Sequence, residues 1–247
     1  MLFIPTVFGA FLPSECQRPG VLALTFEEGP IEYTETILSI LRKNNIKATF
    51  HFNAIFRTPS SNSIILQAYK DGHDVGLRTN PKRDYFQIES ESLIEEDLDA
   101  QVDYLQTVID DKIKYARSPL DGTRVNEIVY QYFVQNKIIQ TNYSFCPYDS
   151  EMNPSDALED HLAVCNPSFD SQIISLYESR LEQDEELQQI INVIKNKGFS
   201  FVTLSGCLPN YKPGDNMSTF ESNSKSSDNI ASIVNNSFMI FVTYYLL

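Results

Sequence analysis

The chain has 247 residues, of which 42% are hydrophobic and 21% are charged, as in an ordinary folded globular protein. This length fits one α/β barrel, so a single folded domain is expected. The formal net charge of −14 argues against nucleic acid and anionic lipid as main partners, because both are bound through basic patches. The same acidity can also serve only to keep a secreted protein soluble.

The predicted elements begin with an apolar segment and then alternate between strand and helix. Residues 1–12 (MLFIPTVFGAFL) match a signal peptide incompletely, because no basic residue precedes the apolar run; an N-terminal strand is the alternative. Residues 13–210 carry β-rich runs at 21–26, 46–52, 74–79, 114–118, 138–145, 172–177 and 199–204. Helical patterns lie between them at 34–45, 63–72, 92–109, 126–137 and 184–198. This α/β order predicts a (β/α) barrel of about seven parallel strands, with functional residues at the carboxyl ends of the strands.

The C-terminal end has the order of a lipid-anchor signal. A polar segment at 211–229, rich in Ser and Asn toward its end, precedes an apolar tail at 230–247, for which a terminal strand is the alternative. The chain is therefore expected to be secreted or at the cell surface, with membrane contact only through such an anchor. Of the sequons at Asn142, Asn216 and Asn235, Asn216 is the best glycosylation candidate, because the other two lie in a predicted strand and in the tail.

The cysteines fit disulfides better than a metal site. Cys16, Cys146, Cys165 and Cys207 form no CxxC pair, and none stands near a histidine at zinc-finger spacing. An even number in a secreted chain suggests Cys16–Cys207, joining the chain ends, and Cys146–Cys165, closing a loop. Free buried thiols are the alternative.

Several segments resemble the motifs of the polysaccharide deacetylases of the chitin deacetylase type, also called the NodB-homology fold or carbohydrate esterase family four. They are LTFEEGP (24–30), IKATFHFNA (46–54), DGHDVGLRT (71–79), RSPLDG (117–122), QIISLYE (172–178) and VIKNKGFSFVTLSGCL (193–208). The resemblance covers 21–208 and implies the distorted (β/α) barrel of that family.

The resemblance also implies a metal site whose ligands have been replaced. The family holds a divalent metal, usually zinc, with one aspartate and two histidines. By register, Glu28 stands at the aspartate, and Arg78 and Lys82 stand at the histidines. Their cationic side chains offer no lone pair to zinc, so no metal cofactor is expected. We expect Arg78 and Lys82 instead to pair with Glu28 and Glu27; the alternative is that both point to solvent.

The proton-transfer positions have changed as well. The resemblance places Glu27 at the catalytic base, and Tyr177 at the histidine that protonates the leaving amine; tyrosine, with an ordinary pKa near 10, is a poor acid for that role. Together with Arg117 and Asp149, these are the vestigial catalytic positions. The expected groove positions are Asn53, Leu120, Asp121 and Tyr148. The three histidines of the chain include no close pair from which a metal site could be rebuilt.

The leading interpretation is a catalytically impaired homologue, secreted or on the cell surface, that binds chitin, chitosan or a surface glycan. One alternative is a weak or altered metal-dependent deacetylase that hydrolyses the carbon–nitrogen bond of an N-acetylated amino sugar. The other is a structural surface protein whose barrel loops are presented to a partner.

Overall fold

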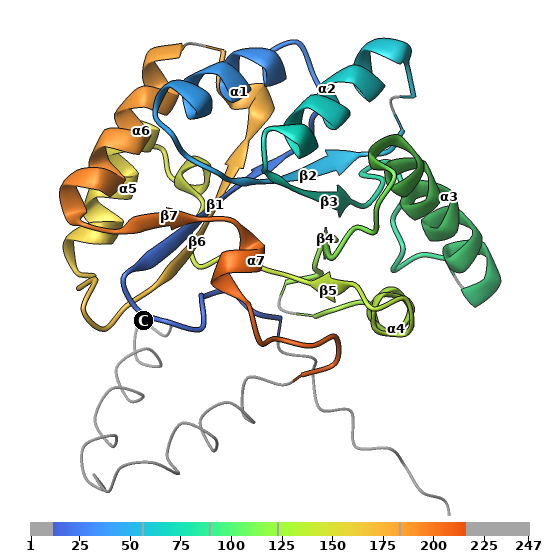
Figure 1. Cartoon of the computed structure of the whole chain (residues 1–247). Coiled ribbons are helices and arrows are strands. Elements are labelled where there is room, and N and C mark those ends of the chain that lie inside the picture. The colour runs from blue at the N-terminus through green and yellow to red at the C-terminus, as the bar shows by residue number, and fades with distance from the viewer. Residues whose placement is uncertain (1–11, 56, 89, 123, 183, 216–247) are drawn as a thin grey trace, which may run out of the picture. The chain divides into compact units, whose positions relative to one another are not determined.

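A computed structural model describes residues 12–215 except positions 56, 89, 123 and 183 (Figure 1). The expected signal peptide, the lipid-anchor tail and the Asn216 sequon lie essentially outside these residues. No helix in the described ranges combines the length and the apolar character needed to cross a membrane.

The sheet is built from parallel strands that follow the predicted runs. They are β1 (Val21–Glu27), β2 (Thr49–Asn53), β3 (Asp74–Arg78), β4 (Tyr115–Arg117), β5 (Ile139–Gln140), β6 (Gln172–Tyr177) and β7 (Ser200–Val202). They are hydrogen-bonded in the order β5-β4-β3-β2-β1-β6. Strand β7 pairs with the first half of β1, and β2 pairs with its second half. Every residue of β1 is buried, as expected for a central parallel strand.

The sheet closes on itself beyond the end of β5. The Ser144 amide donates to the Ile173 carbonyl (2.9 Å), and the Ser175 amide donates to the Phe145 carbonyl (3.0 Å). These bonds join the segment after β5 to β6. The expected distorted (β/α) barrel is therefore confirmed.

The helices form a ring around the sheet (Figure 1). They are α1 (Thr34–Lys43), α2 (Pro59–Lys70), α3 (Glu91–Ile109), α4 (Glu127–Gln135), α5 (Pro154–Ala163), α6 (Asp184–Lys197) and the short α7 (Leu204–Cys207). Neighbouring helices touch in the order α5-α6-α1-α2-α3-α4. The five predicted helices are present, but the prediction placed no helix at α5. That helix begins at Pro154, behind an Asn153 side chain that accepts from the Ser155 amide (3.0 Å).

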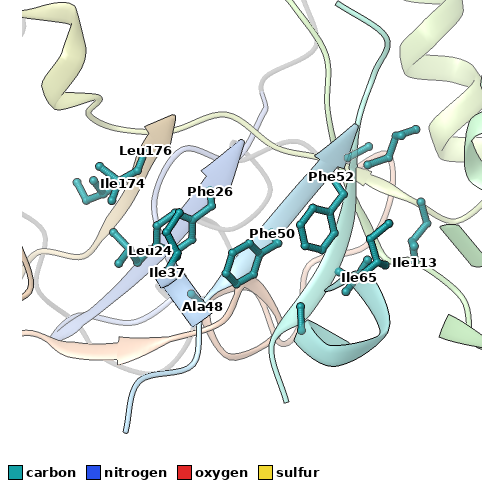
Figure 2. Packing of buried hydrophobic residues seen from close by; sticks show 14 of the residues in the cluster. Leu24, Phe26, Ile37, Ala48, Phe50, Phe52, Ile65, Ile113, Ile174 and Leu176 are labelled. Atoms are coloured by element: carbon teal, nitrogen blue, oxygen red, sulfur yellow. The ribbon is translucent and has the colours of Figure 1, made fainter. Parts of the chain in front are cut away.

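The main core lies between the sheet and the helices. Phe26, Phe50 and Phe52 stack in a row across β1 and β2, with ring centroids 4.8 Å and 5.3 Å apart. Figure 2 shows this row, with Ile37 of α1 and Ile65 of α2 among the side chains of the same cluster. Side chains alternate between the two faces of a strand. The residues next to these phenylalanines along β1 and β2 therefore point to the other face of the sheet, into the barrel.

One of the two expected disulfides is present. Cys16 and Cys207, 191 residues apart, are bonded, so the N-terminal segment is joined to α7. The expected Cys146–Cys165 disulfide is wrong, because both thiols are free. Cys165, just after α5, donates to the His161 carbonyl (3.5 Å) and accepts from the Gln172 side chain (3.6 Å). Those contacts turn its sulfur toward α5 and β6.

Candidate functional site

The last residue of β1, Glu27, is the centre of a buried ion-pair cluster inside the barrel. Its side chain is only 2% exposed. Arg117 Nη1 donates to its Oε1 at 2.6 Å, Ser175 Oγ donates to the same oxygen at 2.8 Å, and Arg78 Nε lies 3.1 Å from Oε2. Strands β4 and β3 are not hydrogen-bonded to β1, so the two arginines reach Glu27 across the barrel interior.

Arg117 is held from several sides. It ends β4 with a side chain that is 4% exposed. Its Nη1 also donates to Thr25 Oγ1 (3.0 Å), and its Nη2 donates to the Asn142 carbonyl (3.0 Å). The guanidinium carbon lies 5.4 Å from the centroid of the Tyr143 ring. These contacts give Arg117 a fixed position beside Glu27.

Burial and the two arginine charges determine the protonation states of the carboxyl and imidazole groups in the cluster. Burial alone would raise the pKa of Glu27, but the nearby Arg117 and Arg78 charges hold it at about 2. Burial, and then the charge of Arg117, keep the pKa of His51 well below its ordinary value. Both ring nitrogens of His51 lack a hydrogen-bond partner among the described residues. At neutral pH the cluster therefore contains an ionised Glu27 beside a neutral His51.

Glu28 faces a different neighbour. It has a left-handed backbone (φ 80°), and its carboxylate accepts from Ser179 Oγ after β6. Glu178 directly precedes Ser179 in the short helix η2 (Glu178–Arg180); it is fully buried, and its carboxyl group accepts from Thr34 Oγ1. Burial raises the pKa of Glu178 to about 8, and the charge of Glu28 acts in the same direction. Among the described residues, no cation lies within ion-pair distance of Glu28.

The expected charge pairing is therefore only partly present. Arg78 does pair with a carboxylate of β1, but with Glu27 and not with Glu28. The expected pairing of Lys82 is wrong: its side chain is exposed, with no carboxylate in ion-pair range in the described part of the chain. Arg78 ends a strand and points inward, whereas Lys82 lies in the following loop, where its amide donates to Asn80 Oδ1 (3.0 Å).

The expected groove positions are divided between two pockets. A pocket of about 480 Å³, here called the loop pocket, is lined by residues 81–87 and 119–121, which include Leu120 and Asp121. A second pocket of about 600 Å³ is lined in part by Tyr148, Arg180 and Glu186. Asn53 lines neither, because it is buried and accepts from the Ile55 amide (3.1 Å).

The remaining predicted positions lie at the rim of the barrel. Tyr177 ends β6, and its ring stacks on Tyr148 with centroids 5.9 Å apart. Burial raises the pKa of the Tyr177 hydroxyl. Asp149 is exposed in the short helix η1 (Pro147–Asp149), and its negative charge adds to that rise. A tyrosine in this environment is an even weaker acid than a free one.

The donor set at the barrel mouth does not fit the metal that the resemblance implies. Glu28 is the carboxylate at the metal-ligand position, while Arg78 and Lys82 bring cations where neutral imidazoles are needed. Within the described residues, no three His, Cys, Asp or Glu side chains are grouped as a metal ion would require.

Sequence reasoning missed three polar residues of the cluster. Thr25 and Ser175 face each other on β1 and β6, and both contact Arg117 Nη1. His51 pairs in register with Glu27 on the neighbouring strand. All three share the strand face of Glu27 or Tyr177, so alternation along β1, β2 and β6 was the signal that could have found them.

The fold and this arrangement define a deacetylase-type α/β barrel with a charged cluster at the carboxyl ends of its strands. The chain belongs to the polysaccharide deacetylase family: the family model "Polysaccharide deacetylase" matches residues 14–136, and chitin deacetylases are among its sequence relatives and structural neighbours.

Two chitin deacetylases are among its sequence relatives. The chain is 25% identical over 221 residues to the one from Colletotrichum lindemuthianum. The aligned region covers 78% of this chain and 82% of that protein. It is 28% identical over 214 residues to the one from Arthroderma benhamiae, covering 81% of this chain and 55% of the relative.

Solved structures share the fold. The chitin deacetylase of Colletotrichum lindemuthianum superposes with a TM-score of 0.70 at 22% identity, covering 81% of this chain and 93% of that one. A pseudoenzyme of carbohydrate esterase family four from Bacillus anthracis gives a TM-score of 0.64 at 15% identity, covering 78% of this chain and 67% of the other. A mutant of that pseudoenzyme, described as having restored enzymatic activity, gives 0.65 at 16% identity, covering 78% and 70%.

Proposed function

We propose that this chain is a catalytically impaired polysaccharide deacetylase homologue that binds a glycan at the mouth of its barrel. One observation carries the proposal: the Arg78 guanidinium, at a position where the resemblance places a metal histidine, lies 3.1 Å from Glu27, at the position of the base. A permanent cation therefore occupies the place where the family chemistry needs an ion and a water.

The chemistry of the individual groups supports loss of hydrolysis. Without a metal, a water keeps a pKa of ~15.7 in place of ~7, so little hydroxide is available at neutral pH. Glu27 is a weak base, because two arginines and Ser175 hold its carboxylate and its pKa is about 2. Tyr177 has a raised pKa and therefore gives up its proton poorly to a leaving amine.

The glycan part of the proposal follows from the relatives. Their names include chitin deacetylases and a peptidoglycan-N-acetylglucosamine deacetylase, so a chitin-like or related amino-sugar polymer is one class of ligand to test. Exposed or half-buried rings near the mouth, such as Phe86 and Tyr148, offer faces on which sugar rings can stack. Secretion is part of the proposal, supported by the Cys16–Cys207 disulfide.

The test is acetate release from chitin oligomers, measured together with the zinc content of protein dialysed against zinc. We expect no acetate and far less than one zinc per chain. A matched variant restores the family residues: Glu27→Asp, Glu28→Asp, Arg78→His and Lys82→His. We expect this variant to bind zinc. Turnover by the unmodified chain, with one zinc bound per molecule, would refute the proposal.

A further inference from the structure

The buried cluster carries more positive than negative charge. Arg78 and Arg117 are permanent cations, and Glu27 is the one carboxylate within ion-pair distance of either among the described residues. Two positive charges and one negative charge leave a net charge of +1. In a chain whose formal net charge is −14, this local excess of positive charge calls for an explanation.

The excess charge can be reached only through Arg78. Arg117 is 4% exposed, and its terminal nitrogens are occupied by Glu27, Thr25 and Asn142. Arg78 is 17% exposed and uses its Nε for Glu27. Among the described residues, its Nη1 makes only a long contact of 3.5 Å, to the Arg117 carbonyl. The outer edge of the Arg78 guanidinium therefore keeps donors that a ligand can use.

The loop pocket lies in the segments that follow these two arginines. Its charged lining residues include Arg83, which lies 3.6 Å from Asp97, and Asp121, which pairs with Arg124. Asp84 also lines the pocket, and its Oδ1 accepts from the Phe86 amide (3.0 Å). Lys82 is the lining cation without a carboxylate partner in the described ranges.

The rest of the pocket lining suits a sugar ring. Pro81, Phe86, Pro119 and Leu120 supply apolar surface, and the volume of about 480 Å³ accommodates a sugar unit with its substituents. A ring that rests on this surface can carry a charged substituent toward Lys82, which lines the pocket, and toward Arg78, which precedes the lining segment along the chain. The lining therefore combines an apolar surface with the Lys82 ammonium group, which no carboxylate pairs in the described part of the chain, and with the Asp84 carboxylate, which no cation pairs there.

We propose that the barrel mouth binds the carboxylate of an acidic sugar, with Arg78 and Lys82 as the binding residues and the loop pocket as the site of the ring. A guanidinium matches a carboxylate geometrically, because its parallel N–H groups can donate to both oxygens. A neutral acetamide would give the +1 charge of the Arg78–Glu27–Arg117 cluster no ion-pair partner, and a glucosamine ammonium would be repelled by it. This inference rests on the proposed function and narrows its ligand from glycans in general to uronate-containing glycans.

The test compares three oligosaccharides of equal length by isothermal titration calorimetry: oligogalacturonate, N-acetylglucosamine oligomers and glucosamine oligomers. We expect oligogalacturonate to bind tightest, and its affinity to fall as salt is raised, because exposed charges are screened. Tighter binding of either of the other two would overturn the inference. It would leave the proposed function intact, which fails if the chain releases acetate with zinc bound. If none of the three oligomers bound, the glycan part of the proposed function and this inference would both fail.

Variants locate the site. Arg78→Gln should weaken oligogalacturonate binding roughly ten- to hundredfold, as expected for loss of a charge-assisted hydrogen bond. Lys82→Gln, at an exposed position that should not affect folding, should weaken it about threefold or more. Lys43→Gln is the control. It removes an equal charge in the last turn of α1, outside the proposed site, and should leave the affinity unchanged. Unchanged affinity in Lys82→Gln would contradict the proposed placement, even if Arg78→Gln failed to fold.

Discussion

The carboxyl group of Glu178 lies directly against the backbone of Gly29. A β-carbon added at Gly29 would overlap the carboxyl group, and Glu178 also accepts from Thr34 Oγ1 at the start of α1. Glu178 is fully buried. One carboxyl group thus connects the loop after β6 with the loop after β1, in which Glu28 and Gly29 lie, and so fixes the position of the barrel mouth.

Gly29→Ala should therefore destabilise the fold. The new methyl group has no space unless Glu178 moves, and overpacking of this kind costs about 1–3 kcal/mol. The measurement is the free energy of unfolding in urea. The same substitution in a Glu178→Ala background should cost much less, because the overlapping group is gone. Equal costs in both backgrounds would show that overlap with the Glu178 carboxyl group is not what destabilises Gly29→Ala.

Glu178 should also make the stability depend on pH. Its pKa in the folded state is about 8, above the ordinary 4.5, so the folded protein keeps a proton that the unfolded chain releases. The stabilisation is complete below about pH 4.5 and is lost as the pH rises through 8. Glu178→Gln cannot titrate, so its melting temperature relative to the unmodified chain should improve from pH 5 to pH 9. A constant difference would contradict this prediction.

The strands were the most predictable part of this structure. VLALTFE is apolar almost throughout, which is typical of a central parallel strand, and β1 is buried at every position. Helix α5 was missed because its sequence, PSDALEDHLA, has few apolar residues; its N-terminus could have been recognised from Asn153 followed by Pro154.

The candidate site was predictable only as far as strand register extends. Glu27, Arg78 and Arg117 end their strands, so their meeting inside the barrel follows from the fold. Lys82 lies beyond the strand, in a loop whose path depends on local turns that no pattern fixed. The Cys146–Cys165 pairing failed for the same reason, since side-chain direction after α5 is set by tertiary contacts.

The thiol content should report the disulfide pattern directly. Mass spectrometry of unreduced, alkylated protein should find two modified cysteines, Cys146 and Cys165, and two unmodified ones. Unfolding is needed before alkylation, because Cys146 is buried. Alkylation of all four cysteines would contradict the Cys16–Cys207 bond.

Replacing both Cys16 and Cys207 by Ser should lower the free energy of unfolding by roughly 2–5 kcal/mol. The bond closes a loop of 191 residues, so its loss frees most of the unfolded chain. Cys165→Ser, which removes a partly buried free thiol, is the control and should cost under about 1 kcal/mol. A similar cost for the two changes would mean that the disulfide contributes little.

Glu27→Gln tests the buried cluster itself. The amide keeps the shape of the side chain but leaves Arg78 and Arg117 without a counter-charge, and breaking a buried pair in this way costs about 3–5 kcal/mol. The control is Asp71→Asn, which removes the partner of the largely exposed Arg42 and should cost about 0–1 kcal/mol.

Because the pKa of Glu27 is about 2 when folded, its contribution to stability is complete above pH 4.5 and is lost as the pH falls through 2. Urea unfolding at pH 7 and pH 3 should therefore show a smaller cost of Glu27→Gln at the lower pH. If the cost at pH 7 were as small as that of Asp71→Asn, the two guanidinium groups would not depend on Glu27, and the charge count that points to an anionic ligand would have to be revised.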